Sequence, residues 1–386
     1  MISSQANINP ELLTFSRERI GYDIPDIAGK LQVKEEKWLS WERGEQKPTT
    51  NQLIRIADYL DRTPAFFYLN SLPDEAEPLS EFRTINNNLF VSGTPKLRAA
   101  IREARRNRVT LLDLYSEQKK TPERIPVLDM PGGSIQEKAQ KIRKWLGIFL
   151  EEQKSWKSSS EALTSWKNLL EQRDIYVVQF PYVDVKECRG FALSEESIPI
   201  LGINSKDTYN AKIFTLIHEL AHILYRDSVL INDSLAGYFG SGRTMEQKCN
   251  QLAAEILVPG EDLARDFDSH NASVNEVKRL SRTFRVSGYV LLIRLKTAQL
   301  ISDEAYRAME SEFSFYDSSG KGSDGGNAYY NQIVRKGRLY LKTAFQSYFD
   351  NQINVAELAN LTGWKVPNLN ELAAKTFGWP KDGRYV

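Results

Sequence analysis

The chain has 386 residues, of which 41% are hydrophobic and 26% are charged, as is ordinary for a soluble globular protein. Its 51 basic and 50 acidic residues leave a net charge of +1, so nucleic acid and membranes exert no overall attraction on it. The two cysteines, Cys188 and Cys249, make no disulfide framework. Without a signal peptide or an apolar run of membrane-spanning length, we expect a cytoplasmic protein of two or three domains and no membrane partner.

Residues 1–70 are predicted to form a small helical domain. Asn9 and Pro10 open a first helix, and Gly44 ends a later one. Further helices are expected over residues 24–31, 34–43, 50–60 and 64–69. The domain contains a short helix, then a tight turn, then a helix that directs Trp38 and Trp41 inward. The run WERGEQKPT follows and leads into an apolar helix. This pattern resembles a helix-turn-helix of the Xre/Cro-repressor type.

The sequence does not decide whether residues 8–69 bind DNA or another protein. The helix that would enter the major groove begins Lys34, Glu35, Glu36, Lys37, and its carboxylates suit the helix dipole but repel phosphates. The domain is not basic, because residues 1–70 hold nine Lys and Arg against ten Asp and Glu. Duplex DNA and a protein contact are therefore both retained as partners.

Residues 71–125 are predicted to connect this domain to the next one. A Pro- and acid-containing stretch, SLPDEAEP, leads into a helix-like run from Thr94 to Glu123. This run is typical of a solvated face or an interdomain strut, and contact with the DNA backbone is the alternative. Its first half carries six basic residues: Lys96, Arg98, Arg102, Arg105, Arg106 and Arg108.

A second domain is predicted over residues 126–316, after a cluster of Pro and Gly. Helical patterns over 135–150 and 160–172 precede three strand-like runs, at 175–180, 189–193 and 198–204. Helical patterns return over 245–257, 261–267, 274–284, 288–298 and 303–312. A Gly/Ser-rich linker at 317–328 and a small helical unit at 329–386 complete the chain. The predicted fold class is mainly α with a small antiparallel sheet (α+β).

The segment from Ala211 to Tyr225 carries the chemistry, because it contains His218, Glu219 and His222 in the pattern H-E-x-x-H. On a helix the two imidazoles lie one turn apart on the same face, where they can share a metal ion, and the glutamate can act on a water molecule there. The rest of the helix is apolar, so we expect it to be buried. The alternative is a pair of core histidines, but buried ionisable groups need a partner such as a cation.

A third ligand is needed for a catalytic zinc ion. The candidates downstream are Glu246, Cys249, Glu255, Asp262 and His270. Glu246 and Glu255 lie on one predicted helix, about 180° apart, so only one of them can face the site. Two imidazoles and one carboxylate favour Zn²⁺.

The chain resembles the ImmA/IrrE-type metallopeptidases, which often carry an Xre-type helix-turn-helix. The resemblance rests on H-E-x-x-H followed by the run E-Q-K-C-N-Q-L-A-A-E-I-L-V-P from Glu246 to Pro259. It implies a zincin-like domain in which Glu246 is the third ligand, Asn250 faces the core and Glu255 points outward. Cys249 departs from the family's usual alanine, and a structural role as a small residue is the expectation for it.

The resemblance implies a regulatory zinc-dependent endopeptidase that cleaves a specific repressor, often itself of the Xre type. Glu219 would be its general base. Besides Asn250, the candidates for ligand support or oxyanion stabilisation are Tyr225, Tyr238, Arg243 and His270. The alternative is a non-catalytic DNA- or protein-binding regulator, such as an antitoxin-like partner of a toxin, that uses the peptidase fold as an interaction module. The intact Glu219 favours the enzyme, because a binding module has no need of a general base.

Overall fold

The computed structural model describes residues 5–60, 62–73, 94–128, 133–225, 229–231, 245–313 and 328–378. The chain divides into two compact units, Met1–Arg102 and Glu103–Val386. None of the described helices is long and apolar enough to cross a membrane.

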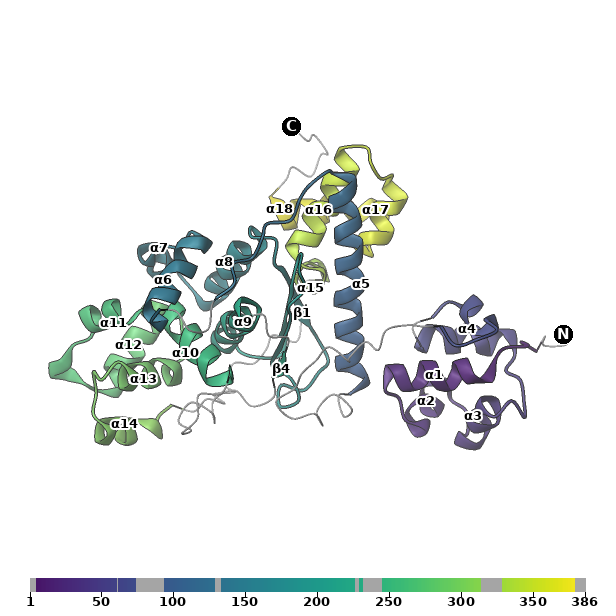
Figure 1. The fold of residues 1–386 in the computed structure, drawn as a ribbon, viewed down its shortest axis with the longest axis horizontal. Helices are drawn as coiled ribbons and strands as arrows, with labels where there is room; N and C mark the ends of the chain where they lie inside the picture. Colours follow the sequence, from purple (N-terminus) through teal and green to yellow (C-terminus); the bar gives the residue numbers. More distant parts are fainter. Residues whose placement is uncertain are drawn as a thin grey trace. The chain divides into compact units, whose positions relative to one another are not determined.

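The N-terminal region of the first unit is helical, as the sequence predicts (Figure 1). Its helices are α1 (Pro10–Ile20), α2 (Ile24–Leu31), α3 (Glu35–Glu42), α4 (Thr50–Tyr59) and the short η1 (Pro64–Tyr68). Local capping sets their ends: Asn9 accepts a hydrogen bond from Glu11 N, and Gly21 ends α1 in the left-handed conformation. Trp38 and Trp41 are buried against each other, with ring centroids 6.0 Å apart, and form the centre of the core.

The second unit is built on a four-stranded sheet with the order β1-β3-β2-β4. Its strands are β1 (Tyr176–Phe180), β2 (Gly190–Leu193), β3 (Ile200–Asn204) and β4 (Val229–Ile231). The strand β2 pairs antiparallel with β3 and β4, but β1 and β3 are parallel, with Tyr176 opposite Ile200. The predicted fold class, mainly α with a small sheet, is confirmed, but the expected antiparallel pairing does not hold for β1 and β3. The reason is the path of the chain. The strand β2 runs in the direction opposite to β1, and β3 then reverses direction again and lies between them, so β3 is parallel to β1 and antiparallel to β2.

One long helix, α9 (Tyr209–Leu224), packs against β2 and β3 and is buried continuously from Lys212 onward. It also contacts α8 (Ser159–Glu171) and α10 (Met245–Leu257), and α10 in turn packs on α6 (Ile135–Leu146). Figure 1 shows these helices together on one side of the sheet. Their apolar side chains form one continuous core with the sheet, so α9 and α10 are fixed relative to each other.

Residues 103–117 of α5 (Pro95–Glu117) act as a strut within the second unit. The Arg108 guanidinium donates hydrogen bonds to the carbonyls of Ser197 and Ile198, in the turn between β2 and β3. Further along the chain, Tyr115 Oη donates to Asp174 Oδ1 over 2.6 Å. Arg108 therefore has the structural role of a strut residue, which is one of the two roles that the sequence predicts for the basic run.

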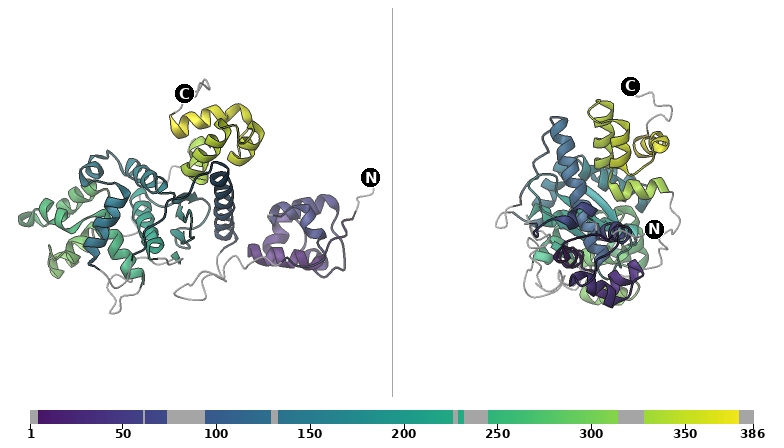
Figure 2. Two further views of the ribbon diagram at one scale, coloured as in Figure 1. Left: turned by 45° about the horizontal axis from the view of Figure 1, so that its top comes forward. Right: turned by 90° about the vertical axis from the view of Figure 1, so that its right-hand side faces the viewer.

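The C-terminal helices form a group of their own in the second unit (Figure 1 and Figure 2). They are α15 (Ala328–Lys336), α16 (Arg338–Phe349), α17 (Val355–Thr362), the short η4 (Val366–Asn368) and α18 (Leu369–Phe377). Between α15 and α16 lies Gly337, with φ +77°, where a Cβ atom would be only 2.7 Å from Val177 O. This glycine lets the C-terminal helices approach the backbone of the edge strand β1.

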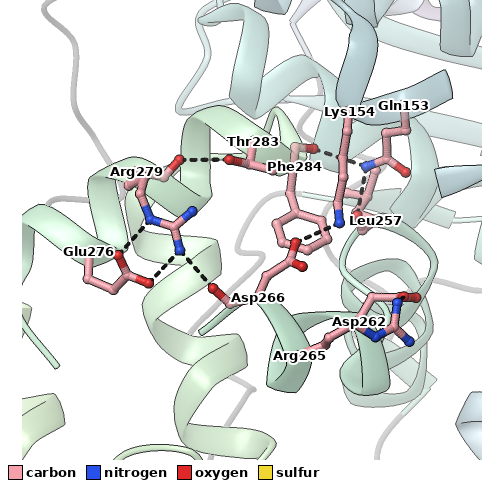
Figure 3. Close-up of polar contacts among 10 residues, drawn as sticks. All are labelled: Gln153, Lys154, Leu257, Asp262, Arg265, Asp266, Glu276, Arg279, Thr283 and Phe284. Carbon is pink, nitrogen blue, oxygen red and sulfur yellow. Dashed lines mark hydrogen bonds and ion pairs between the residues drawn. The ribbon is translucent and has the colours of Figure 1, made fainter. Parts of the chain in front are cut away.

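A polar network holds the carboxyl end of α10 in place (Figure 3). The network involves α7 (Leu150–Ser155), α11 (Gly260–Asp266) and α12 (Val274–Phe284). Two further helices, α13 (Gly288–Thr297) and α14 (Asp303–Glu310), follow α12 in the chain. The buried Gln153 amide donates to Leu257 O over 2.8 Å and to Phe284 O over 3.0 Å, and Lys154 pairs with Asp266. A buried amide with both N–H groups satisfied fixes the neighbouring backbone.

Candidate metal centre

The two histidines of α9 lie side by side in the core. Thr208 caps the helix by accepting a hydrogen bond from Ala211 N, and the apolar side chains that follow bury it. His218 is 2% exposed and His222 is fully buried, and their Nε2 atoms are 3.1 Å apart. The helical spacing of four residues therefore directs both ring nitrogens to one point, as expected.

The third converging group is Glu246, in the first turn of α10. Its Oε2 lies 3.3 Å from His218 Nε2 and its Oε1 lies 3.4 Å from His222 Nε2. The buried Ala253 and Ala254 lie further along α10, the helix that packs on α9. Among the described residues, only His218, His222 and Glu246 form such a cluster, with one ligand atom each and all three atoms within 4.8 Å of one another.

The protonation states favour ligand character. Burial lowers the pKa of His218, and the neighbouring His222 lowers it further, while the hydrogen bond with Glu246 raises it. Burial also raises the pKa of Glu246, but hydrogen bonds with both histidines outweigh burial and hold that pKa well below its usual range. A neutral imidazole and an ionised carboxylate are the forms that bind metal ions.

Glu219 is a buried carboxyl without a hydrogen-bond partner for either oxygen among the described residues. Burial raises its pKa well above the usual range, His222 lowers it and Glu246 raises it. Such a group is costly unless something in the site satisfies it. The three convergent donors, two imidazoles and one carboxylate, fit a metal ion of the zinc type. The Glu219 carboxyl fits a water molecule beside that ion.

A glycine that the sequence did not single out shapes the space around Glu219. A Cβ atom on Gly190, in β2, would lie 2.5 Å from Thr215 Cγ2 and 2.8 Å from Glu219 Oε1. The neighbouring Cys188 lies close enough for the Glu219 charge to raise its pKa, although burial is the larger cause. A glycine within a buried strand is a signal of close approach, and it could have identified this position.

The structure places three of the five remaining candidates. Asn250 is buried on α10 and lies close enough to His218 to raise the pKa of that imidazole. Tyr225 ends α9, where burial raises its pKa to about 12. His270 is exposed on the short helix η3 (Ser269–Asn271) and is not brought to the cluster. Tyr238 and Arg243 lie outside the described residues.

Three further candidates for the third ligand are placed elsewhere. Glu255 faces away from the cluster as expected, but the expectation that it points outward is wrong. It is 4% exposed, pairs with Arg294 and accepts a hydrogen bond from Gly260 N over 2.8 Å, because the Arg294 side chain extends from α13 to this carboxylate. Asp262 pairs with Arg265 on α11. Cys249 is fully buried, and its thiol is not part of the cluster of ligand atoms.

Comparison with known families places this centre in context. Residues 170–296 match the Peptidase_M78 family model, described as an IrrE N-terminal-like domain. The match begins near the end of α8 and ends within α13, so it contains the sheet, α9 and α10. It supports the resemblance of this segment to the ImmA/IrrE peptidases and, at the level of the family, a metallopeptidase. No curated protein matches the chain.

Proposed function

We propose that the chain is a zinc-dependent endopeptidase that cleaves a specific regulatory protein in the cytoplasm. The observation that carries this proposal is the Glu219 carboxyl, which has no hydrogen-bond partner among the described residues and lies in the turn of α9 between two histidines that converge with Glu246. A metal site with a purely structural role would need only the three converging ligands His218, His222 and Glu246. A fully buried carboxyl without a partner is explained by a reaction that uses it.

In this mechanism His218, His222 and Glu246 hold the ion. Zinc, when bound, would polarise the scissile carbonyl and lower the pKa of a water molecule. Glu219 would take the proton of the attacking water and pass it to the leaving amine, and the raised pKa of this carboxyl suits a group that must carry a proton. Asn250, which is buried close to His218, would help to hold the orientation of that imidazole.

The sheet offers two edges to an extended substrate, and they differ. Gly337 approaches the backbone of β1, so this edge is covered by the C-terminal helices. The strand β4 forms the opposite edge, next to β2, whose Gly190 borders Glu219. A peptide that adds to the sheet as a further strand would therefore pair with β4.

The helices α1–α4 would act as an Xre-type helix-turn-helix that binds duplex DNA or a protein partner. An Xre-type repressor as substrate and a toxin-like partner are both consistent with this role. Binding to duplex DNA would weaken steeply with rising salt, whereas binding to a protein through apolar surface contacts would depend less on salt.

The test compares zinc-loaded wild type with Glu219→Gln, using the products of neighbouring genes as substrates. We expect cleavage by the wild type and a fall in rate of about 10²- to 10⁴-fold in the variant, because the general base is lost. The zinc content should stay unchanged in Glu219→Gln, since this residue is not a ligand. Equal cleavage by both proteins would contradict the peptidase. Biological activity that survives in Glu219→Gln would favour the non-catalytic regulator.

A further inference from the structure

A cavity of about 440 Å³ lies between α6, the start of α7 and the junction of α10 with α11. Glu255 lines it, and because this residue is nine positions after Glu246, the cavity lies on the face of α10 opposite the metal ligands. Its apolar wall includes Ala139, Ile148 and Pro259. The volume falls within the range of about 300–1,000 Å³ that is usual for small-molecule sites.

Arg143 contributes a buried positive charge to this cavity. The residue is 8% exposed, and its Nη1 donates hydrogen bonds of 2.7 Å to two neutral groups, Gln153 Oε1 and Ile256 O. Among the described residues, Nη2 has no hydrogen-bond partner, and no ion pair includes Arg143. A buried guanidinium that lacks a counter-charge is unfavourable, so this site is electrostatically incomplete.

Three acidic residues line the cavity, and among the described residues none of them forms an ion pair with Arg143. One of them, Glu261, is exposed to solvent. Glu255 is already paired with Arg294 and bonded to Gly260 N, and Asp262 is paired with Arg265. Burial lowers the pKa of Arg143 to about 10, and it outweighs the opposing influence of Asp262 and Glu151. Lys144, at the exposed rim, adds a second positive charge.

We propose that this cavity binds a small organic anion, a monocarboxylate with an apolar body, whose carboxylate serves as the counter-charge of Arg143. The apolar wall suits the body of such a ligand, and the ring of Phe149, which lines the cavity and is 73% exposed, would be covered by it. A neutral ligand would leave the Arg143 charge uncompensated.

The cavity also has a physical connection to the metal centre. Arg143 bonds to Ile256 O and Gln153 bonds to Leu257 O, so both hold the carboxyl end of α10 (Figure 3 shows the Gln153 contacts). Glu246 lies at the start of the same helix. A ligand that satisfies Arg143 would therefore stabilise the helix that supplies the third metal ligand, as an effector of the peptidase would. This last role rests on the proposed function, but binding itself does not.

Calorimetric titration of the full-length, zinc-loaded protein tests the proposal without any assay of peptidase activity. The probes are straight-chain and aromatic monocarboxylates, among them octanoate and benzoate, each with its matched alcohol. We expect saturable binding of the carboxylates, about tenfold or more tighter than the alcohols, as a charge-assisted contact would give. Gln140→Trp, an exposed substitution that fills the cavity wall, should abolish binding.

Two further variants separate charge from fold. Arg143→Met should weaken carboxylate binding by about tenfold or more and remove the preference over the alcohols. Lys141→Met removes an exposed charge from the same helix outside the cavity and should bind as the wild type does. Circular dichroism checks the fold of Arg143→Met, and if it does not fold, the wild-type preference and Gln140→Trp decide. No saturable binding to the wild type, equal affinity for acid and alcohol, or unchanged binding in Gln140→Trp would each overturn the proposal.

Discussion

At the scale of single residues, the centre depends on what surrounds Glu219. The helical spacing within H-E-x-x-H and the wheel of the later helix place His218, His222 and one of two glutamates near each other from sequence alone. The burial of the other glutamate, Glu255, could not be predicted in this way. This residue pairs with Arg294, which is 39 residues further along the chain. Contacts of this kind depend on tertiary packing and leave no local signal.

Gly190→Ala tests the close approach of β2 to α9. The added Cβ atom would lie 2.5 Å from Thr215 Cγ2 and 2.8 Å from Glu219 Oε1, so we expect a loss of stability of about 1–3 kcal/mol and a lower rate of cleavage. Urea denaturation measures the first effect. Thr215→Ser removes Cγ2, and the double variant should therefore recover part of the stability. A Gly190→Ala protein as stable as the wild type would show that β2 and α9 are further apart than described here.

At the scale of the elements, the helices were largely predictable because their ends are set locally. Asn354 and Glu357 form a capping box at the start of α17, and Gly363 ends this helix in the left-handed conformation. The sheet was less predictable. The strand β4 has only three residues and was not predicted, and the parallel pairing of β1 with β3 depends on where the chain returns, which short apolar runs do not encode.

Gly337→Ala tests the contact between the C-terminal helices and β1. The substitution combines a strained φ of +77° with a Cβ atom 2.7 Å from Val177 O, so we expect a loss of about 2–4 kcal/mol. Gly378→Ala is the matched control, because its φ of +73° is similar but no atom of the described residues lies within 4 Å of the added Cβ. It should cost only about 1–2 kcal/mol. Equal losses in thermal denaturation would remove the argument that β1 is closely covered.

The contact of α8 with α16 is expected to depend on pH. Burial raises the pKa of Glu171 to about 7, although Lys167 and the Arg338 backbone N–H, which donates to Glu171 Oε1 over 3.0 Å, lower it. A carboxyl whose pKa is higher in the folded state holds an extra proton there, so stability falls as pH rises from about 4.5 to about 7. The fall should be about 3 kcal/mol at most.

Glu171→Gln stays neutral throughout this range and provides the comparison. Denaturant melts at pH 5 and pH 7.5 should show a smaller loss of stability in Glu171→Gln than in the wild type. Parallel pH profiles for the two proteins would contradict the raised pKa.

At the scale of the whole molecule, the family match over residues 170–296 and the convergent donors concern the same segment of the second unit. The N-terminal helices α1–α4 and the C-terminal helices α15–α18 lie outside that match. Substrate choice and partner binding are therefore expected to depend on these flanking parts. Hydrolysis, by contrast, should depend on α9 and α10, so the proposed peptidase activity depends on the metal centre.

The most direct test of the metal centre is the zinc content of the purified full-length chain after dialysis, measured by mass spectrometry of the metal. We predict about one zinc ion per chain in the wild type and a sharp loss in Glu246→Ala, which removes one of three protein ligands. Cys249→Ala, on the same helix, should keep the metal, because its thiol is not part of the cluster. Zinc that persists in Glu246→Ala, or is lost in Cys249→Ala, would contradict the metal centre described here.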